Sequence, residues 1–309
     1  MPFISVCVPA YKNTPLLAQL FDSIAGQTYQ DFELVVSDDS DNDDIRLLTE
    51  KYRDRLPAVH YHKPSRRLGM GGNWNRTLDM ASGEWLKIMH DDDWFSGPDS
   101  LASFAAAAAE AGSGFIFSDY INFYEQTGRE KSFSFPEKKS AALLKTPEIL
   151  IAKNIVGNPS CTLVRRDIPV RYDVRMKWRI DIDYYIQILH QTRSFRHIAR
   201  PLVHVGMNEQ QMTNSVKLNP AVELPEAYGL LIKNGEDILE HIVVYDAYWR
   251  MFRNMQVFDK ATLHQYSDQE WDKHIYRMIR DLGSCNPRLL RNGFYSKAKM
   301  FLSFTGRNK

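Results

Sequence analysis

Short apolar segments rich in β-branched residues alternate with segments of helical spacing over the first 90 residues. The apolar segments predict strands at 3–8, 32–36, 59–62 and 84–89, and the intervening segments predict helices at 14–24, 45–52 and 73–81. This alternation is typical of right-handed βαβ units. The chain is therefore predicted to be an α/β protein with a Rossmann-like, mostly parallel sheet flanked by helices.

Polar residues follow these predicted strands at their C-terminal ends. They are Tyr11, Asp38 and Asp39, the loop 66–72, and the triplet Asp91, Asp92 and Asp93. In open parallel sheets, ligands bind beyond the carboxyl ends of the strands. We therefore expect these residues to converge on one binding site, because independent surface loops have no reason to fall on the same edge.

The acidic triplet directly follows the predicted strand 84–89. Adjacent ionised carboxylates repel one another unless a cation or ligand donors compensate their charge. Mg²⁺ and Mn²⁺ commonly bind one or two carboxylates together with substrate phosphates. A solvated acidic loop is the competing interpretation, and the spacing alone favours it. The convergence of the other strand ends favours a binding site.

The rest of the chain divides into two parts. Helices are predicted at 100–111, 146–154 and 186–191, strands at 114–119, 161–164 and 197–205, and a mobile loop or edge hairpin at 122–139. Beyond residue 220 only long helices are predicted, at 225–255 and 263–282. We accordingly expect an α/β domain over residues 1–215 and a C-terminal helical region over 216–309.

Net charge and cysteine content indicate which kinds of binding partner and which cellular compartment to expect. The formal net charge is +1, so there is no global electrostatic argument for a nucleic-acid partner. Three widely spaced cysteines do not suggest a zinc cluster or a disulfide framework. No signal-peptide pattern or membrane-spanning run is recognised, which predicts a cytoplasmic location. Residues 288–309 are basic and amphipathic; they either contact the inner face of an anionic membrane or pack on the protein itself.

Taken together, these residues resemble the family 2 glycosyltransferases, which have the GT-A fold. The resemblance covers roughly residues 4–215. Four matches in the right order carry it: Val8-Pro9-Ala10-Tyr11, Asp38-Asp39-Ser40, Gly69 with Asn73 before Gly83-Glu84, and the Asp-x-Asp motif at Asp91–Asp93. The chain departs from the family at His90, where an Asp is frequent, and at Ile180, where a Glu is frequent.

The resemblance implies a role for each matching residue. A nucleotide sugar would contact Pro9, Ala10, Tyr11, Asp38, Asp39, Arg67, Gly69, Asn73, Asp91 and Asp92. Asp93, with Asp91, would bind Mn²⁺ or Mg²⁺. Asp181 matches the catalytic position, where it would remove a proton from the acceptor hydroxyl. One base and no protein nucleophile imply direct displacement with inversion.

The implied reaction moves a hexose from a UDP-, GDP- or dTDP-sugar to a glycan or lipid-linked acceptor in surface polysaccharide biosynthesis. Two alternatives stay open. A nucleotidyltransferase would also use clustered aspartates, although such enzymes commonly have a Gly-rich basic loop where this chain has residues 9–13. A non-catalytic nucleotide-sugar-binding protein is left open by Ile180, while Asp181 and Asp183 argue against it.

Overall fold

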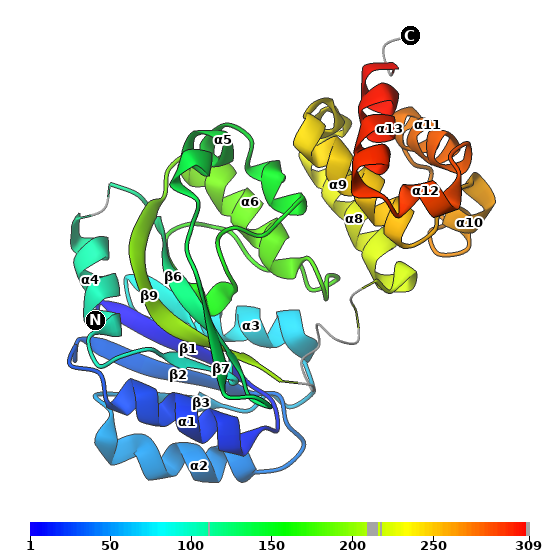
Figure 1. Ribbon diagram of the computed structural model, residues 1–309. Helices are drawn as coiled ribbons and strands as arrows, with labels where there is room; N and C mark the ends of the chain where they lie inside the picture. The colour runs from blue at the N-terminus through cyan, green and yellow to red at the C-terminus, as the bar shows by residue number, and fades with distance from the viewer. Residues whose placement is uncertain (111, 209–215, 217, 307–309) are drawn as a thin grey trace.

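The computed structural model describes residues 1–110, 112–208, 216 and 218–306. The predicted alternation of strands and helices is confirmed in the N-terminal part of the chain (Figure 1). Its elements are β1 (Ile4–Ala10), α1 (Thr14–Ala25), β2 (Phe32–Asp38), α2 (Asp44–Tyr52), β3 (Val59–His62), α3 (Gly69–Met80) and β4 (Trp85–Ile88). Pro15 lies in the first turn of α1. A backbone N–H at that position has no partner within the helix, so proline costs no hydrogen bond there.

The sheet contains nine strands, in the order β3-β2-β1-β4-β8-β6-β9-β5 with β7 paired to β6. The later strands are β5 (Asp93–Phe95), β6 (Phe115–Tyr124), β7 (Arg129–Phe133), β8 (Thr162–Arg165) and β9 (Arg196–Met207). The first four strands of this order pair in parallel, as do β6 and β9. The remaining pairs, which involve β5, β7 and β8, are antiparallel.

Helices cover both faces of the sheet, and each face has its own hydrophobic core. Successive side chains of β1 alternate between them: Val6 and Val8 join the core that includes α1 and α2, whereas Cys7 joins the core beneath α3. α4 (Ser100–Glu110) contributes to the first core, and α6 (Ile180–Thr192) contributes to the second. The α/β architecture is thus a sheet between two helical layers (Figure 1).

Several predicted boundaries differ from the structure. α3 begins at residue 69 rather than 73, because the Asp39 carboxylate accepts hydrogen bonds from the backbone N–H groups of Leu68 and Gly69 at the N-terminus of the helix. α6 begins at residue 180 rather than 186. The predicted helix 146–154 is the short 3₁₀ helix η3 (Pro147–Ile151), followed by η4 (Pro159–Cys161). The segment 122–139 contains the β6–β7 hairpin, the second of the two predicted alternatives.

After residue 219 the described chain is entirely helical or irregular. The helices are α8 (Pro220–Asn234), η5 (Glu236–Glu240), α9 (Ile242–Asn254), α10 (Lys260–His264), α11 (Lys273–Gly283), α12 (Pro287–Leu290) and α13 (Gly293–Thr305). The single helix predicted at 225–255 is wrong, because Gly235 has a φ of 87° and interrupts it. The helix predicted at 263–282 is likewise divided, between α10 and α11.

α8 packs against the segment that leads into α6. Lys233 of α8 forms ion pairs with Asp173 at 2.6 Å and with the buried Asp183 at 2.8 Å. α9 contacts α13, where Trp249 donates a hydrogen bond to Ser296 at 3.0 Å. Within the described ranges, no helix has both the length and the apolar character required to cross a bilayer. Residue 111, the predicted domain limit at 215 and residues 307–309 lie outside the described residues.

Candidate functional site

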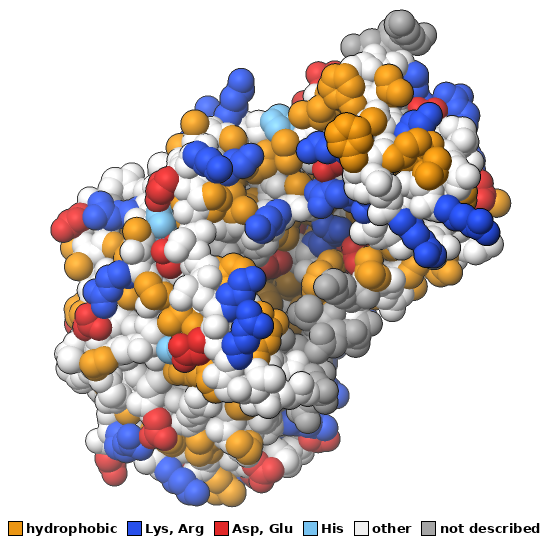
Figure 2. All heavy atoms as spheres, in the orientation of Figure 1, with side chains coloured by type: hydrophobic (Ala, Val, Ile, Leu, Met, Phe, Trp, Pro, Cys, Tyr) orange, Lys and Arg blue, Asp and Glu red, His pale blue; other side chains and the backbone are white. Residues whose placement is uncertain are grey.

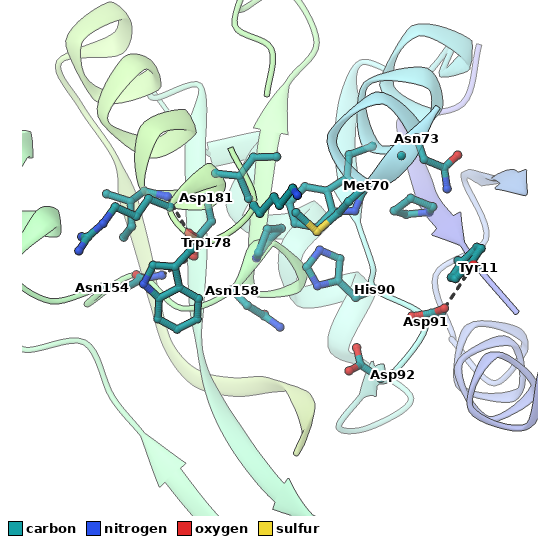
Figure 3. A pocket seen from close by; sticks show the side chains of 18 of the residues that line it. Tyr11, Met70, Asn73, His90, Asp91, Asp92, Asn154, Asn158, Trp178 and Asp181 are labelled. Atoms are coloured by element: carbon teal, nitrogen blue, oxygen red, sulfur yellow. Dashed lines mark hydrogen bonds between the residues drawn. The ribbon is translucent and has the colours of Figure 1, made fainter. Parts of the chain in front are cut away.

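A cavity of about 720 Å³ opens at the carboxyl ends of β1, β2 and β4 (Figure 3). Parts of residues 150–159 and 177–182 form the opposite wall. The predicted site residues that line it are Pro9, Tyr11, Asp39, Arg67, Gly69, Asn73, Asp91, Asp92 and Asp181. The cavity therefore brings together residues that are far apart in the chain, from Pro9 to Asp181, as the topology predicted.

Asp39 fixes one end of the cavity. Its carboxylate accepts hydrogen bonds from the backbone nitrogens of Leu68 at 2.7 Å and Gly69 at 3.0 Å. The adjacent Arg67 guanidinium lies over the Tyr11 ring, 4.6 Å from its centroid. An aromatic face and a cationic group thus stand together where a planar, electron-rich ring would be recognised.

Asn73 presents an unused hydrogen-bond acceptor in the same region. Its side-chain nitrogen donates to the carbonyl of Ala10 at 3.2 Å. Its Oδ1 atom is buried and has no hydrogen-bond partner within the described chain. An unpaired buried acceptor costs about 1–3 kcal/mol, which a ligand donor would recover.

Two predicted nucleotide-binding residues lie beneath the cavity rather than on its wall. Ala10 is fully buried, and its carbonyl accepts from Asn73 and from the backbone of Asp39. Asp38 is also fully buried and accepts from the Ser40 backbone at 2.8 Å and the Tyr61 hydroxyl at 2.7 Å. In this structure both residues shape the loop that carries Tyr11 and Asp39.

The three consecutive aspartates point in different directions. Asp91 lies near the β1 end, where its carboxylate accepts from the backbone nitrogen of Tyr11 at 3.4 Å (Figure 3). Burial, and then the charge of Asp92, raise the pKa of Asp91 to about 7. Asp92 also lines the cavity. The ionised form of Asp91 is therefore destabilised near neutral pH unless a positive charge is nearby.

Asp93 is held below the cavity surface. Its carboxylate accepts from the Asn158 side chain at 2.7 Å and from the Gly206 backbone at 3.1 Å. Burial, followed by the charge of Asp92, raises its pKa. Glycine is required at position 206, because the end of β9 passes so close to the acidic turn that a Cβ there would lie 2.1 Å from the carbonyl oxygen of Asp92. Asp93 thus joins the acidic turn to η4 and to the end of β9.

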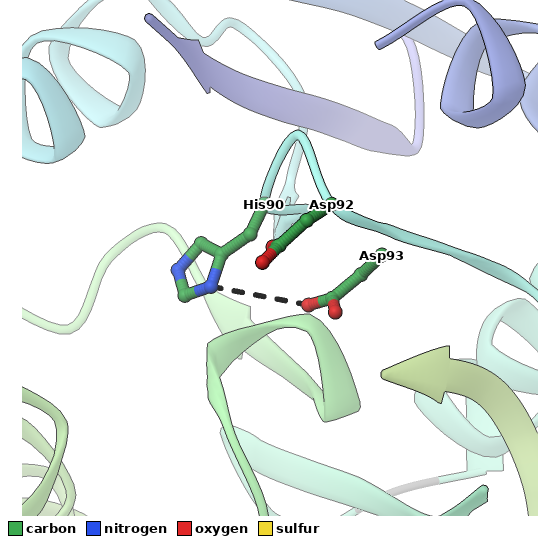
Figure 4. Close-up of side chains that lie close together, drawn as sticks. All are labelled: His90, Asp92 and Asp93. Atoms are coloured by element: carbon green, nitrogen blue, oxygen red, sulfur yellow. Dashed lines mark ion pairs between the residues drawn. The ribbon is translucent and has the colours of Figure 1, made fainter. Parts of the chain in front are cut away.

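His90 completes an acidic cluster that could hold a metal ion. Ligand atoms of His90, Asp92 and Asp93 all lie within 4.8 Å of one another (Figure 4). Burial, and then Lys87, lower the pKa of His90 to about 4, so its imidazole is neutral and able to ligate. Its buried Nε2 has no hydrogen-bond partner among the described residues. This oxygen-rich set with one imidazole suits Mn²⁺ or Mg²⁺.

Asp181 lies in the first turn of α6, on the opposite wall of the cavity. Its carboxylate accepts from the Asn154 side chain at 2.9 Å and from the Ile182 backbone at 2.8 Å. Burial raises its pKa to about 6, and these hydrogen bonds oppose the rise. A carboxylate with this pKa is ionised at neutral pH and yet basic enough to take a proton. Ile180, the preceding residue, is buried in the core.

The backbone that leads into Asp181 is fixed by a residue of α8. The Glu226 carboxylate accepts from the backbone nitrogens of Lys177 at 2.6 Å, Trp178 at 3.0 Å and Arg179 at 2.7 Å. Glu226 is buried, so these bonds are shielded from water. They satisfy amide groups at the start of α6, which has no capping side chain of its own.

Sequence reasoning missed several residues of this site. His90 enters the sequence argument only as a departure from the family, although its place directly before the triplet is a usable signal. Asn154 and Asn158 lie in the irregular segment between η3 and η4, which has no recognisable motif. Glu226 lies in the helical region that was expected to be separate. Trp178 also lines the cavity.

Comparisons with known proteins place the chain in a family. The family model described as "Glycosyl transferase family 2" matches residues 5–168. A Campylobacter jejuni relative, named GalNAc(5)-diNAcBac-PP-undecaprenol beta-1,3-glucosyltransferase, is 35% identical over 94 residues. That match covers 30% of this chain and only 30% of the relative's own length.

Solved structures of two proteins share the fold. Staphylococcus aureus TarS 1-349, in complex with UDP-GlcNAc, has a TM-score of 0.64 and 18% identity, covering 97% of this chain and 89% of that chain. The mannosyltransferase PcManGT from Pyrobaculum calidifontis, in complex with GDP-Man and Mn²⁺, has a TM-score of 0.57 and 16% identity, covering 99% and 87%. At these identities the likeness shows the fold alone, which is the expected GT-A fold.

Proposed function

Because the chain belongs to glycosyl transferase family 2, we propose that it transfers a hexose from a nucleoside diphosphate sugar to a hydroxyl of a glycan or lipid-linked acceptor. One observation carries this proposal. One cavity is lined by a subsite suited to a nucleotide around Asp39 and Asn73, by Asp91 and Asp92 with the buried Asp93 beside them, and by a carboxylate of raised pKa at Asp181. These are the groups that donor binding, leaving-group stabilisation and acceptor activation require.

The donor nucleoside would bind between Tyr11, Arg67 and Asn73. The stacked Tyr11 and Arg67 offer a planar surface for the base. The buried Asn73 Oδ1 would accept a hydrogen bond from the base or the ribose. Pro9, Asp39 and Gly69 complete this end of the cavity. UDP-, GDP- and dTDP-sugars all fit this chemistry, and the binding of UDP-GlcNAc and GDP-Man by proteins of the same fold supports it.

The acidic cluster would hold Mn²⁺ or Mg²⁺ through Asp92 and Asp93, with Asp91 beside them and His90 as a further donor. The proximity of these ligand atoms and the raised pKa values of Asp91 and Asp93 support this assignment. When bound, the ion would supply Lewis-acid stabilisation of the leaving diphosphate. Asn158 and Gly206 would keep the Asp93 carboxylate in place.

Asp181 would act as the general base. The acceptor oxygen forms a bond to the anomeric carbon as its proton passes to the Asp181 carboxylate. The bond between that carbon and the diphosphate oxygen breaks, and the nucleoside diphosphate departs with the electron pair. Because the acceptor attacks from the face opposite the leaving group, the anomeric configuration inverts. Asn154 would orient the carboxylate through its hydrogen bond.

The acceptor would enter beside Trp178 and Lys177, which line the wall around Asp181. An indole ring in this position can stack on a sugar ring, and a lysine can contact a phosphate. The name of the C. jejuni relative specifies a lipid-linked glycan, which supports an acceptor of this class.

The proposal is tested by titration calorimetry with UDP-, GDP- and dTDP-sugars, with and without Mn²⁺, followed by product analysis. We expect one donor to bind and to yield a nucleoside diphosphate in the presence of a glycan acceptor. Asp181→Asn should bind that donor normally and lose transfer. Release of pyrophosphate from a nucleoside triphosphate would instead establish a nucleotidyltransferase. Donor binding without turnover over a broad acceptor panel would favour a non-catalytic binding protein.

A further inference from the structure

The outward face of α13 exposes large apolar side chains. Phe294 is 88% exposed, Phe301 51% and Leu302 62%. These residues recur at the spacing of one helical face, whereas Ser296 and Met300 on the other side are buried. Figure 2 shows hydrophobic side chains gathered on this part of the molecule, with Lys and Arg side chains around them. Exposed aromatic groups in such number commonly mark a contact surface.

The charged side chains that α12 and α13 themselves carry all have one sign. No acidic residue occurs in the sequence after Asp281, whereas Arg288, Arg291, Lys297 and Lys299 all fall within α12 and α13 or the turn between them. Two copies of this face would place like charges against each other, which disfavours self-association through it. The charge instead complements an anionic surface.

A second cavity, of about 400 Å³, adjoins these helices. Arg253, Arg288 and Arg291 line it, together with neutral residues that include Asn254 and Phe258. No carboxylate is among the lining residues, and Arg288 and Arg291 form no ion pair with the described chain. Arg253 is held by the Ser296 hydroxyl at 3.0 Å and by Asn254. Burial, and then the nearby Arg250, lower the pKa of Arg253, as expected where positive charge is in excess.

We propose that this arginine cavity binds the phosphate of an anionic lipid headgroup while the exposed face of α13 enters the interfacial layer of the bilayer. Guanidinium groups match phosphate oxygens through paired hydrogen bonds. Apolar insertion and phosphate binding are each weak alone, and together they give stable peripheral attachment. This property is independent of the proposed transferase reaction, because none of these residues lines the cavity around Asp181.

Vesicle co-sedimentation of the full chain tests this inference. The wild type should bind vesicles containing phosphatidylglycerol and should bind vesicles of phosphatidylcholine alone much more weakly. Arg288→Gln with Arg291→Gln should lower the partition coefficient about fivefold for each charge removed. Phe294→Ser should lower it on the order of tenfold. Matched controls are Arg46→Gln with Lys51→Gln for charge, and Leu47→Ser, a 54% exposed side chain on α2, for apolar area.

Circular dichroism melting should show that each variant is folded. Equal binding to the two vesicle types, or equal loss in the α2 controls, would overturn the headgroup site. Absence of binding by the folded wild type would overturn the whole inference. A concentration-dependent dimer in light scattering that Phe294→Ser abolishes, without vesicle binding, would assign the face to a second copy of the chain instead.

Discussion

The side-chain amide of Asn154 donates a hydrogen bond of 2.9 Å to the carboxylate of Asp181. This contact joins the irregular segment between η3 and η4 to the first turn of α6 in the wall of the cavity. It stabilises the ionised carboxylate, whereas burial destabilises it, and burial has the larger effect. The balance between the two sets the pKa of the proposed base and leads to the first two predictions.

Transfer should depend on the ionisation of Asp181. A general base acts only when deprotonated, and the pKa of Asp181 is about 6. We expect kcat/KM to be constant above this pH and to fall about tenfold for each pH unit below it. Asp181→Asn should reduce kcat by roughly 10²–10⁴-fold, and the residual rate should lose the acidic limb, the fall in rate below pH 6. A profile that is flat down to pH 4.5 would contradict the assignment.

Asn154→Ala should move the acidic limb to higher pH. The substitution removes a donor that favours the charged carboxylate, so the pKa of Asp181 should rise. Activity at neutral pH should fall and recover as the pH increases, which a pH–rate profile measures directly. Asn75→Ala is the control, because Asn75 bonds to the Tyr172 backbone instead. An unshifted limb in Asn154→Ala would show that the contact does not tune the base.

Glu226→Gln should impair catalysis from outside the cavity. A glutamine side chain has one acceptor oxygen, whereas the Glu226 carboxylate has two. Some of the backbone N–H groups of residues 177–179 would therefore lose their acceptor. We expect the free energy of unfolding to fall by about 1–3 kcal/mol in a denaturant titration. Because these amides fix the backbone that leads into Asp181, kcat should fall by a larger factor than the Kd for the donor rises. Glu240→Gln, an exposed position of η5, provides the comparison; equal effects in both variants would dismiss the positioning role.

Mn²⁺ should stabilise the protein through the acidic cluster. Saturation to 100 times the Kd would add about 2.7 kcal/mol to the free energy of unfolding. Asp92→Asn and Asp93→Asn should each reduce this increment, as followed by thermal unfolding with and without the ion. Asp41→Asn removes an exposed carboxylate near the same sheet edge and should retain the full response. An equal response in all four proteins would place the ion elsewhere.

The periodic part of the chain was predictable because its signals are local. Strand and helix alternation up to β4 follows from apolar spacing within short windows, and it placed Tyr11, Asp39 and Asp91 at one edge of the sheet, where they line the cavity. The family resemblance, rather than the spacing, pointed to Asp181. The interruption at Gly235 was not predictable in the same way. The apolar pattern continues through it, and only the left-handed φ shows that the helix stops there.

The finer geometry of the acidic turn could not be read from spacing. Asp91, Asp92 and Asp93 are consecutive, yet the backbone turns sharply at the first two and enters β5 at the third. Only the pairing of β5 with β9 takes Asp93 toward Gly206, which is 113 residues later. Long-range contacts of this kind leave no trace in a local pattern, and the same holds for Glu226 and its amide partners.

The contacts of α8 also concern how the chain folds. Lys233 neutralises Asp183 and Asp173, and Glu226 receives the amides before α6. A truncated chain that stopped near residue 215 would bury Asp183 without a counter-charge and leave those amides unsatisfied. The sheet and the C-terminal helices should therefore melt in one cooperative transition, and a shortened enzyme should be recovered as aggregate rather than as an active fragment.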